Sequence, residues 1–272
     1  MEATWLGRLL EVVPLAGALL VAGYAGAVPS EAESRSGAGA GGRVAVRFLG
    51  HACFLLQWQP EGGAAPVRVV TDPYPADMGY GPLQVSADLV VASHDHFDHC
   101  ASGAVGGRPE TIIGTSGKGK DWVACDREVK GLRVKGFPTY HDPGRGGERG
   151  KNMAFLVQAG DFRFLHLGDL GHVLSPDQAQ DIGPVDVLFV PVGGHYTIDA
   201  SQAWQVVGAL RPKVAVPMHY LTPAIRDWPL APVDEFLRAR PSVPVRHMAE
   251  AEVAPGGLPQ ALEVWHLVGP QG

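Results

Sequence analysis

The chain has 272 residues, of which 46% are hydrophobic, and its formal net charge is -6 at pH 7. This apolar share argues against disorder and supports one large domain with a sizeable core, although the length alone would also permit two. The acidic balance gives no reason to expect nucleic acid as a partner. The 36 glycines and 23 prolines predict many turns between short elements rather than long helices.

Residues 1–29 predict a signal peptide or a membrane anchor. Residues 12–22 are an uncharged run rich in Leu, Val and Ala, and Ala25-Gly26-Ala27 offers a small-x-small cleavage site. Two glutamates weaken the positive charge expected before that run, so an uncleaved anchor or a buried N-terminal helix stays open. We expect an exported (periplasmic or extracellular) or membrane-anchored protein, with a cytoplasmic one as the alternative. Residues 30–42 resemble a flexible linker in composition, and the folded domain is expected over 43–272.

Three antiparallel strands are predicted at the start of this domain. Residues 43–49 alternate apolar side chains on one face, residues 52–58 form a second apolar run, and a Pro-Glu-Gly-Gly turn leads into 67–71. His51 lies at the turn between the first two strands, either near a functional site or as a structural residue. The Gly/Pro-rich loop 74–82 is a candidate wall of a substrate pocket.

The strongest functional signal is the run Ser-His-Asp-His-Phe-Asp-His at 93–99, which follows a short apolar strand at 87–92. Neither strand nor helix packing requires this spacing, whereas neutral imidazole and carboxylate suit a divalent cation such as zinc. The run therefore predicts a metal site, with a solvated polar loop as the alternative. The small residues 101–104 predict the start of a helix. Cys100 fits the opening of that helix, and the three cysteines do not indicate a disulfide framework.

Further along the chain, short strands deliver more polar residues at their ends. Strands are predicted at 111–114 and 132–138, and His141 follows the second, opening a loop that carries Arg145, Arg149 and Lys151. That loop is either solvated or an anion-binding lid. A hairpin of 152–158 and 162–166 leads to Asp169, which stands close to two glycines; His166 and His172 are interpreted as structural.

The last third of the chain alternates strands and helices. A strand at 186–191 continues through Gly193-Gly194-His195 into a helix at 200–210, for which Thr197 or Asp199 is the N-cap. A strand at 214–216 then ends at His219, and a helix at 232–240 and a strand at 261–268 close the chain. Hairpins followed by this alternation predict two mixed sheets with helices outside.

The pattern His94-x-His96-x-Asp98-His99 after an apolar strand resembles the signature of the metallo-β-lactamase superfamily. The surroundings are similar to a branch of small metal-dependent hydrolases that includes ascorbate-phosphate lactonases and N-acyl-phosphatidylethanolamine phospholipase D type enzymes. The segments that carry this narrower likeness are 50–54, 71–74, 168–169, 191–195 and 217–220.

This resemblance implies an α/β fold, the four-layer αββα sandwich, and a centre for two divalent metal ions. His94, His96 and His141 would hold one ion, Asp98, His99 and His219 the other, and Asp169 would bridge them. Zinc is the expected metal, and the ligands would also accept manganese or iron.

A metal-bridged hydroxide in such a centre predicts a hydrolase that cleaves an ester, lactone or phosphodiester bond of a small molecule, which is anionic if the cationic loop binds it. Asp98 would also steer a proton, and His195 is predicted to contact the substrate or donate a proton, with a structural role as the alternative. A β-lactam or amide hydrolase and a non-catalytic metal-binding protein of the same fold stay open. A redox di-iron enzyme would be expected to have Glu where His96 stands.

Overall fold

The computed structural model describes residues 41–269. The predicted signal or anchor segment and nearly all of the predicted linker lie outside these residues. Within 41–269, every helix is too short or too polar to cross a membrane.

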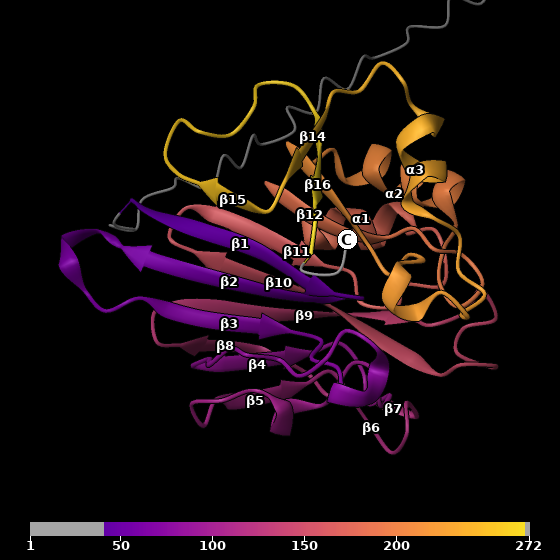
Figure 1. Cartoon of the computed structure of the whole chain (residues 1–272), viewed down its shortest axis with the longest axis horizontal. Helices are drawn as coiled ribbons and strands as arrows, with labels where there is room; N and C mark the ends of the chain where they lie inside the picture. Colours follow the sequence, from indigo (N-terminus) through magenta and orange to yellow (C-terminus); the bar gives the residue numbers. More distant parts are fainter. Residues whose placement is uncertain (1–40, 270–272) are drawn as a thin grey trace, which may run out of the picture. The chain divides into compact units, whose positions relative to one another are not determined.

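Two mixed sheets form the domain (Figure 1). The six-stranded sheet has the order β15 (Glu250–Val253), β1 (Gly42–Gly50), β2 (Cys53–Pro60), β3 (Val67–Thr71), β4 (Leu89–Ala92) and β5 (Glu110–Ile113). The eight-stranded sheet has the order β14 (Val245–Met248), β16 (Glu263–Leu267), β13 (Val214–Met218), β12 (Val187–Pro191), β11 (Phe162–His166), β10 (Lys151–Ala159), β9 (Leu132–Tyr140) and β8 (Asp126–Val129). A separate pair joins β6 (Thr115–Ser116) to β7 (Asp121–Trp122).

The predicted antiparallel pairing of β1, β2 and β3 and the predicted hairpin of β10 and β11 are confirmed. β1, β2 and β3 are antiparallel, and β3, β4 and β5 are parallel. In the second sheet β8 to β11 are antiparallel, whereas β11, β12, β13 and β16 run parallel. The mixed-sheet architecture of the metallo-β-lactamase fold is thereby confirmed.

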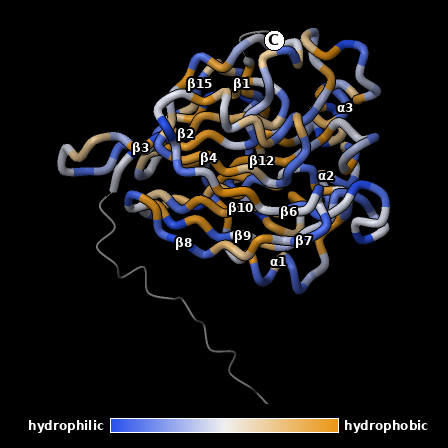
Figure 2. Tube along the Cα trace, turned by 90° about the horizontal axis from the view of Figure 1, so that it is seen from below, coloured by the Kyte–Doolittle hydropathy of each residue, from blue (hydrophilic) through white to orange (hydrophobic). Residues whose placement is uncertain are grey.

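The main core lies between the two sheets, where apolar side chains alternate inward from both. Phe54 of β2 and Phe189 of β12 are almost fully buried, and their ring centroids lie 4.4 Å apart. Each such ring contributes about 1.5–3 kcal/mol by its removal from water. Figure 2 shows the same pattern along the chain, with hydrophobic strands inside and hydrophilic loops around them.

Helices cover the outer face of the second sheet. The helices are α1 (Pro176–Ile182), α2 (Ala200–Leu210) and α3 (Val233–Ala239). The side chain of Asp199 accepts a hydrogen bond from the N–H of Gln202, and the Gln202 side chain accepts one from the N–H of Asp199. This capping box satisfies two backbone donors and starts α2, so Asp199 is the N-cap. Trp204 of α2 stacks on Phe236 of α3 at 4.5 Å.

The outer face of the first sheet is covered by loops and short 3-10 turns. Tyr74, Met78 and Tyr80 are buried against that sheet, and the Tyr74 hydroxyl donates to the carbonyl of Leu49 at 2.6 Å. The loop 74–82 therefore packs as an outer layer in which Tyr80 lines a cavity of about 270 Å³, and the role of this loop as a wall of a substrate pocket stays a prediction. The burial of its aromatic rings outweighs the loop-like composition.

The predicted helix start at 101–104 is also wrong. Only a 3-10 turn, Ser102–Ala104, forms there, and it ends at Val105 in extended backbone. The segment lacks an apolar stripe that would bury a longer helix, and Gly106 returns at once to bridge with Ser86 next to the first sheet.

Candidate metal centre

The site residues all follow the ends of strands and gather from both sheets. Parallel strands present their carboxyl ends at one edge, which is where such sheets commonly carry their sites. His51 follows β1, Asp72 follows β3, residues 93–99 follow β4, His141 follows β9, Asp169 stands three residues after β11, and His219 follows β13.

The first group of candidate ligands is His94, His96 and His141, whose ring nitrogens lie within 4.8 Å of one another. His94 Nε2 is 3.0 Å from His96 Nδ1. Burial lowers the pKa of both His94 and His96, with a further lowering from neighbouring histidines. Both rings are therefore neutral at pH 7, which is the form that binds a metal ion.

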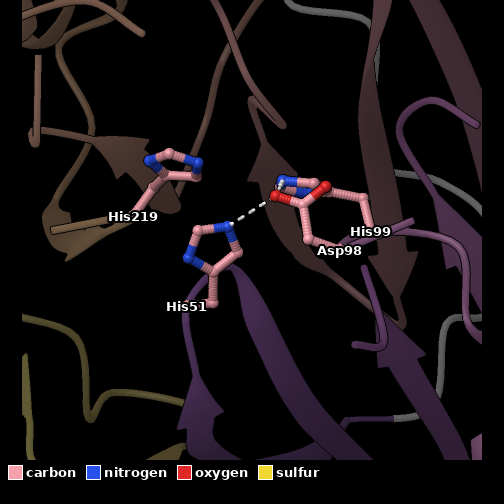
Figure 3. Close-up of side chains that lie close together, drawn as sticks. All are labelled: His51, Asp98, His99 and His219. Carbon is pink, nitrogen blue, oxygen red and sulfur yellow. Dashed lines mark ion pairs between the residues drawn. The ribbon is translucent and has the colours of Figure 1, made fainter. Parts of the chain in front are cut away.

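The second group consists of Asp98, His99, His219 and also His51, whose side chains point toward one another (Figure 3). His51 Nε2 lies 3.3 Å from Asp98 Oδ2 without hydrogen-bond geometry, and the ring centroids of His51 and His219 are 4.0 Å apart. Burial and the adjacent His219 lower the pKa of His51 to about 3. His51 is thus also a neutral imidazole.

Asp169 lies between the two groups. Its Oδ2 is 3.2 Å from the Nε2 of His141 in the first group, and 3.2 Å and 3.3 Å from the Nε2 atoms of His99 and His219 in the second. Burial raises the pKa of Asp169, but the surrounding histidines outweigh it and hold the pKa well below its usual range. A single ionised oxygen is thus within reach of both groups.

The backbone around Asp169 fixes its position. Its N–H donates to Asn152 Oδ1 at 3.0 Å, and Asn152 Nδ2 donates to the Leu167 carbonyl at 2.8 Å. Gly168 has φ 55°, and a Cβ there would overlap the side chains of Asn152 and Ser93. Glycine is therefore required at 168 for both its conformation and its size.

Behind the candidate ligands, the buried carboxylate of Asp72 orients two of them. It accepts hydrogen bonds from the N–H of Ser93 at 2.6 Å and from the Ser93 hydroxyl at 2.7 Å, and it lies 2.9 Å from His99 Nδ1. The Ser93 hydroxyl in turn lies 2.9 Å from His94 Nδ1. A carboxylate that accepts from Nδ1–H leaves the lone pair of Nε2 facing the centre, as metal-binding histidines require.

The donor set fits divalent cations. Seven buried side-chain nitrogen or oxygen atoms lack a hydrogen-bond partner among residues 41–269, and six of them belong to His51, His99, His141, Asp169 and His219. Burial of unpaired polar atoms is costly. Within the same residues the carboxylates of this centre lie within 4.0 Å of histidine nitrogens but form no ion pair with Lys or Arg. A divalent cation in the centre would partner His99 Nε2, Asp169 Oδ1 and one ring nitrogen of His51, whereas Nδ1 of His141 and of His219 belongs to rings whose Nε2 faces the centre.

Comparison with known proteins places the chain in a family. Residues 45–219 match the family model described as a beta-lactamase superfamily domain. A metal-dependent hydrolase of the UPF0173 family from Carboxydothermus hydrogenoformans is 31% identical over 219 residues, which cover 70% of this chain and 89% of the relative. The chain belongs to the UPF0173 metal-dependent hydrolases of the metallo-β-lactamase superfamily.

Other relatives of this UPF0173 hydrolase agree. A UPF0173 metal-dependent hydrolase from Thermoplasma acidophilum is 28% identical over 194 residues, 65% of this chain and 83% of the relative. The crystal structure of a candidate Zn-dependent hydrolase of the metallo-β-lactamase superfamily from Thermotoga maritima has 35% identity and a TM-score of 0.64, covering 82% of this chain and 98% of that one. A diiron β-hydroxylase from Streptomyces venezuelae, at 16% identity and a TM-score of 0.52, shares the fold alone and covers 83% of this chain and 53% of its own.

A cavity of about 940 Å³ opens over the centre of this UPF0173 hydrolase. His96, Asp98, His141, Asp169 and His219 line it. All seven ligands predicted from the sequence lie together beside or beneath this cavity, and the assignment of each to a metal ion stays a prediction.

His195 is placed differently. Its side chain is exposed, its backbone has φ 47°, and its ring contacts Tyr196 edge-on at 4.4 Å. Tyr196 lines the cavity, whereas His195 is not among the lining residues. A catalytic role for His195 stays a prediction, and Tyr196 is the residue of this loop that is positioned to touch a ligand. His166 is buried with Nε2 2.8 Å from the Ala52 carbonyl, consistent with its structural interpretation.

Two residues of the UPF0173 centre are not assigned from the sequence: His51 stays open between a functional and a structural role, and Asp72 is given no role. Asp72 carried a detectable signal, since an acid directly after a strand that neighbours the His-rich loop reaches the same sheet edge. The sequence signal for His51 is weaker, because a contact between distant loops places it in the centre: the N–H of His219 donates to the His51 carbonyl at 2.8 Å.

Replacing His51 with Asn tests whether it helps to hold a cation. His51 has φ 56°, a conformation that Asn tolerates better than most residues. We expect the variant to bind the second metal equivalent about 10-fold or more weakly, while the first equivalent is retained, because only the second group loses a donor. Metal titration followed by calorimetry measures this. Unchanged affinity for both equivalents would make His51 a packing residue.

Proposed function

We propose that this protein hydrolyses an ester, lactone or phosphodiester bond of a small molecule at a dinuclear metal centre. His94, His96 and His141 would hold one divalent cation, Asp98, His99 and His219 the other, and Asp169 would contact both. The observation that carries the proposal is the position of Asp169 Oδ2, within 3.3 Å of nitrogens from both groups. Zinc is the metal we expect, and manganese or iron also suits the ligands.

Two divalent cations in this centre would supply a nucleophile at neutral pH and polarise the oxygen of the scissile group. The protein's own residues position the reactants. Asp98 has a lowered pKa, because His99 and His51 outweigh the raising effect of burial. It is thus ionised at pH 7, and its carboxylate orients a water molecule by accepting its hydrogen bond rather than by storing a proton. This range of bonds is proposed from the motif resemblance to lactonases and phospholipase D type enzymes, whereas the relatives support the broader class of metal-dependent hydrolases.

Metal removal tests the proposal. We expect purified protein to hold close to two divalent cations per chain, and a chelator to abolish hydrolysis reversibly. Because the folded state binds the metal, its removal should also lower stability, by about 4 kcal/mol where the free metal stood at 1,000 times its dissociation constant. Elemental analysis and thermal unfolding with and without chelator measure both effects. A protein that takes up no metal would refute the proposal.

A substrate panel then defines the bond. The metal-loaded protein is assayed against lactones, phosphodiesters, carboxylic esters and β-lactams, with chelated protein as the control for each. We expect chelator-sensitive turnover in one of the first three classes. Turnover of β-lactams alone would favour an amide hydrolase instead.

A further inference from the structure

We propose that the substrate carries an oxyanion, a phosphate or carboxylate group separate from the bond that is cleaved, and that two cationic loops of the cavity hold it. The lysine loop is residues 117–120 between β6 and β7, and the arginine loop is residues 142–150 between β9 and β10. The inference rests on the proposed function, because that proposal identifies the cavity as the active site. The positions of the two loops are established separately, by their own hydrogen bonds.

Five cationic side chains line the cavity that contains the metal centre. They are Lys118, Lys120, Arg145, Arg149 and Lys151. Apart from the carboxylates of the metal centre, the one acidic side chain that lines it is Glu148, among residues 41–269. This concentration of positive charge stands out in a chain whose net charge is -6, and like charges gathered around one cavity raise the local concentration of anions.

Three of the five cations have no carboxylate partner. Arg149 lies 3.3 Å from the exposed Glu148, and Lys151 lies 3.8 Å from Asp121 and over the ring of Trp122. Lys118, Lys120 and Arg145 form no ion pair with any residue in 41–269. Their donors are therefore available to an oxyanion, for which Arg offers a fork of donors and Lys a point charge.

Both loops are held in place through their backbone rather than their charges. Asp95, between two candidate ligands, accepts a hydrogen bond from the N–H of Lys118 at 2.8 Å and one from the Thr115 hydroxyl at 3.0 Å. Asp142, next to His141, accepts from the N–H groups of Gly146, Glu148 and Arg149 at 2.8–3.0 Å. Each cationic loop is thus fixed directly to a segment that carries a candidate ligand, and these bonds do not use its cationic side chains.

The lysine loop also contacts the end of the arginine loop and the first residue of β10. The N–H of Lys151 donates to the Gly119 carbonyl at 2.8 Å, and a Cβ on Gly150 would lie 3.0 Å from the same oxygen. A solvated loop would not need this fixed approach. Loops that are positioned before the ligand arrives lose little conformational entropy when they bind it.

Aromatic side chains complete the cavity. Phe97, between two candidate ligands, is 66% exposed, and it lines the cavity together with Tyr196 and Trp228. Exposure of a large apolar ring beside a metal centre is explained if it contacts the organic part of a ligand. The cavity volume of about 940 Å³ suits a small molecule. The geometry thus favours an organic acid or organophosphate over a simple neutral ester.

Binding of two non-hydrolysable probes tests the inference without relying on turnover. Phenylphosphonate and benzoate are titrated by calorimetry into the metal-loaded wild type and the double variant Lys118→Gln/Arg145→Gln. Any direct contact of the probe with the metals is common to both proteins. We expect at least one probe to bind the variant about 10-fold or more weakly, and the stronger of the two effects distinguishes phosphate from carboxylate.

The control is Arg43→Gln/Arg47→Gln on β1. It also removes two positive charges, but from residues that do not line the cavity. It should bind both probes as the wild type does. Lys118→Arg should retain most of the affinity, which separates loss of charge from loss of folding. Equal binding of both probes to the double variant and the wild type would overturn the inference.

Kinetics separate this inference from the proposed function. A neutral p-nitrophenyl ester and its analogue with a terminal carboxylate are compared as substrates. We expect kcat/KM for the anionic ester to fall about 10-fold in the double variant, with less than about a twofold change for the neutral ester. Equal loss for both esters would contradict an anion-binding role. Absence of hydrolysis by the wild type would count against ester cleavage, while the probe titrations still decide the anion site.

Discussion

Replacing Asp169 with Asn is expected to remove at least one of two bound cations and to lower turnover by more than about 100-fold. This loss exceeds the roughly 10- to 100-fold effect of replacing a residue that only hydrogen-bonds to a metal ligand. The Oδ2 atom of Asp169 lies within 3.3 Å of nitrogens from both groups of candidate ligands. Asn would place either a neutral oxygen or an N–H donor there, and neither can replace a shared anionic ligand. Elemental analysis and turnover of the reconstituted variant measure the two effects.

Asp161→Asn is the matched control, because it makes the same substitution at the exposed turn between β10 and β11. Its metal content and turnover should match those of the wild type. If Asp169→Asn still binds two cations with wild-type affinity, Asp169 is not shared between them.

Replacing Asp72 with Asn should weaken metal binding about 10- to 100-fold while leaving the fold intact. Ser93 N–H must donate to position 72, so the Asn oxygen takes that place and the amide NH₂ faces the Ser93 hydroxyl and His99 Nδ1. An NH₂ group can only donate, so His99 must keep Nδ1 as an acceptor and carry its proton on Nε2. That proton would point into the centre, where a cation needs a lone pair.

Asn also tolerates the left-handed backbone of residue 72, whose φ is 37°. Asp77→Asn, on the exposed part of the following segment, is the control for the change in charge. Metal titration against a competing chelator measures the affinity, and thermal unfolding of the metal-free proteins verifies the fold. Wild-type metal affinity in Asp72→Asn would show that the tautomer of His99 is not set by Asp72.

Hydrophobic periodicity predicts most strands of this domain, because each strand buries at least one apolar face. The segments 43–49, 52–58 and 67–71 correspond to β1, β2 and β3 in the predicted antiparallel arrangement. β8 shows no such signal, since three of its four residues are exposed. The start of helix α1 has a different local signal in the sequence: Ser175-Pro176 followed by Gln178 is the pattern of a capping box, and the structure contains that capping box.

The candidate site was predictable in part, because the residues of 93–99 are neighbours in the sequence and the others each follow a predicted strand. What sequence could not supply is the pairing of distant loops. His51 reaches the centre through the backbone contact with His219, and the lysine loop meets the arginine loop at Gly119 and Lys151. These contacts depend on the packing of two sheets and leave no local pattern.

The way in which the two cationic loops are anchored affects how new substrates could be acquired. Asp95 and Asp142 hold main-chain N–H groups, so the side chains at 118, 120, 145 and 149 contribute nothing to holding the loops through these bonds. Substitutions at those four positions therefore leave these anchoring bonds in place, provided that the new residues at 118 and 145 tolerate the left-handed backbone there, with φ of 60° and 59°. We therefore expect variation or directed evolution at these four positions to alter which acids the proposed anion site accepts while the loops keep their anchoring bonds.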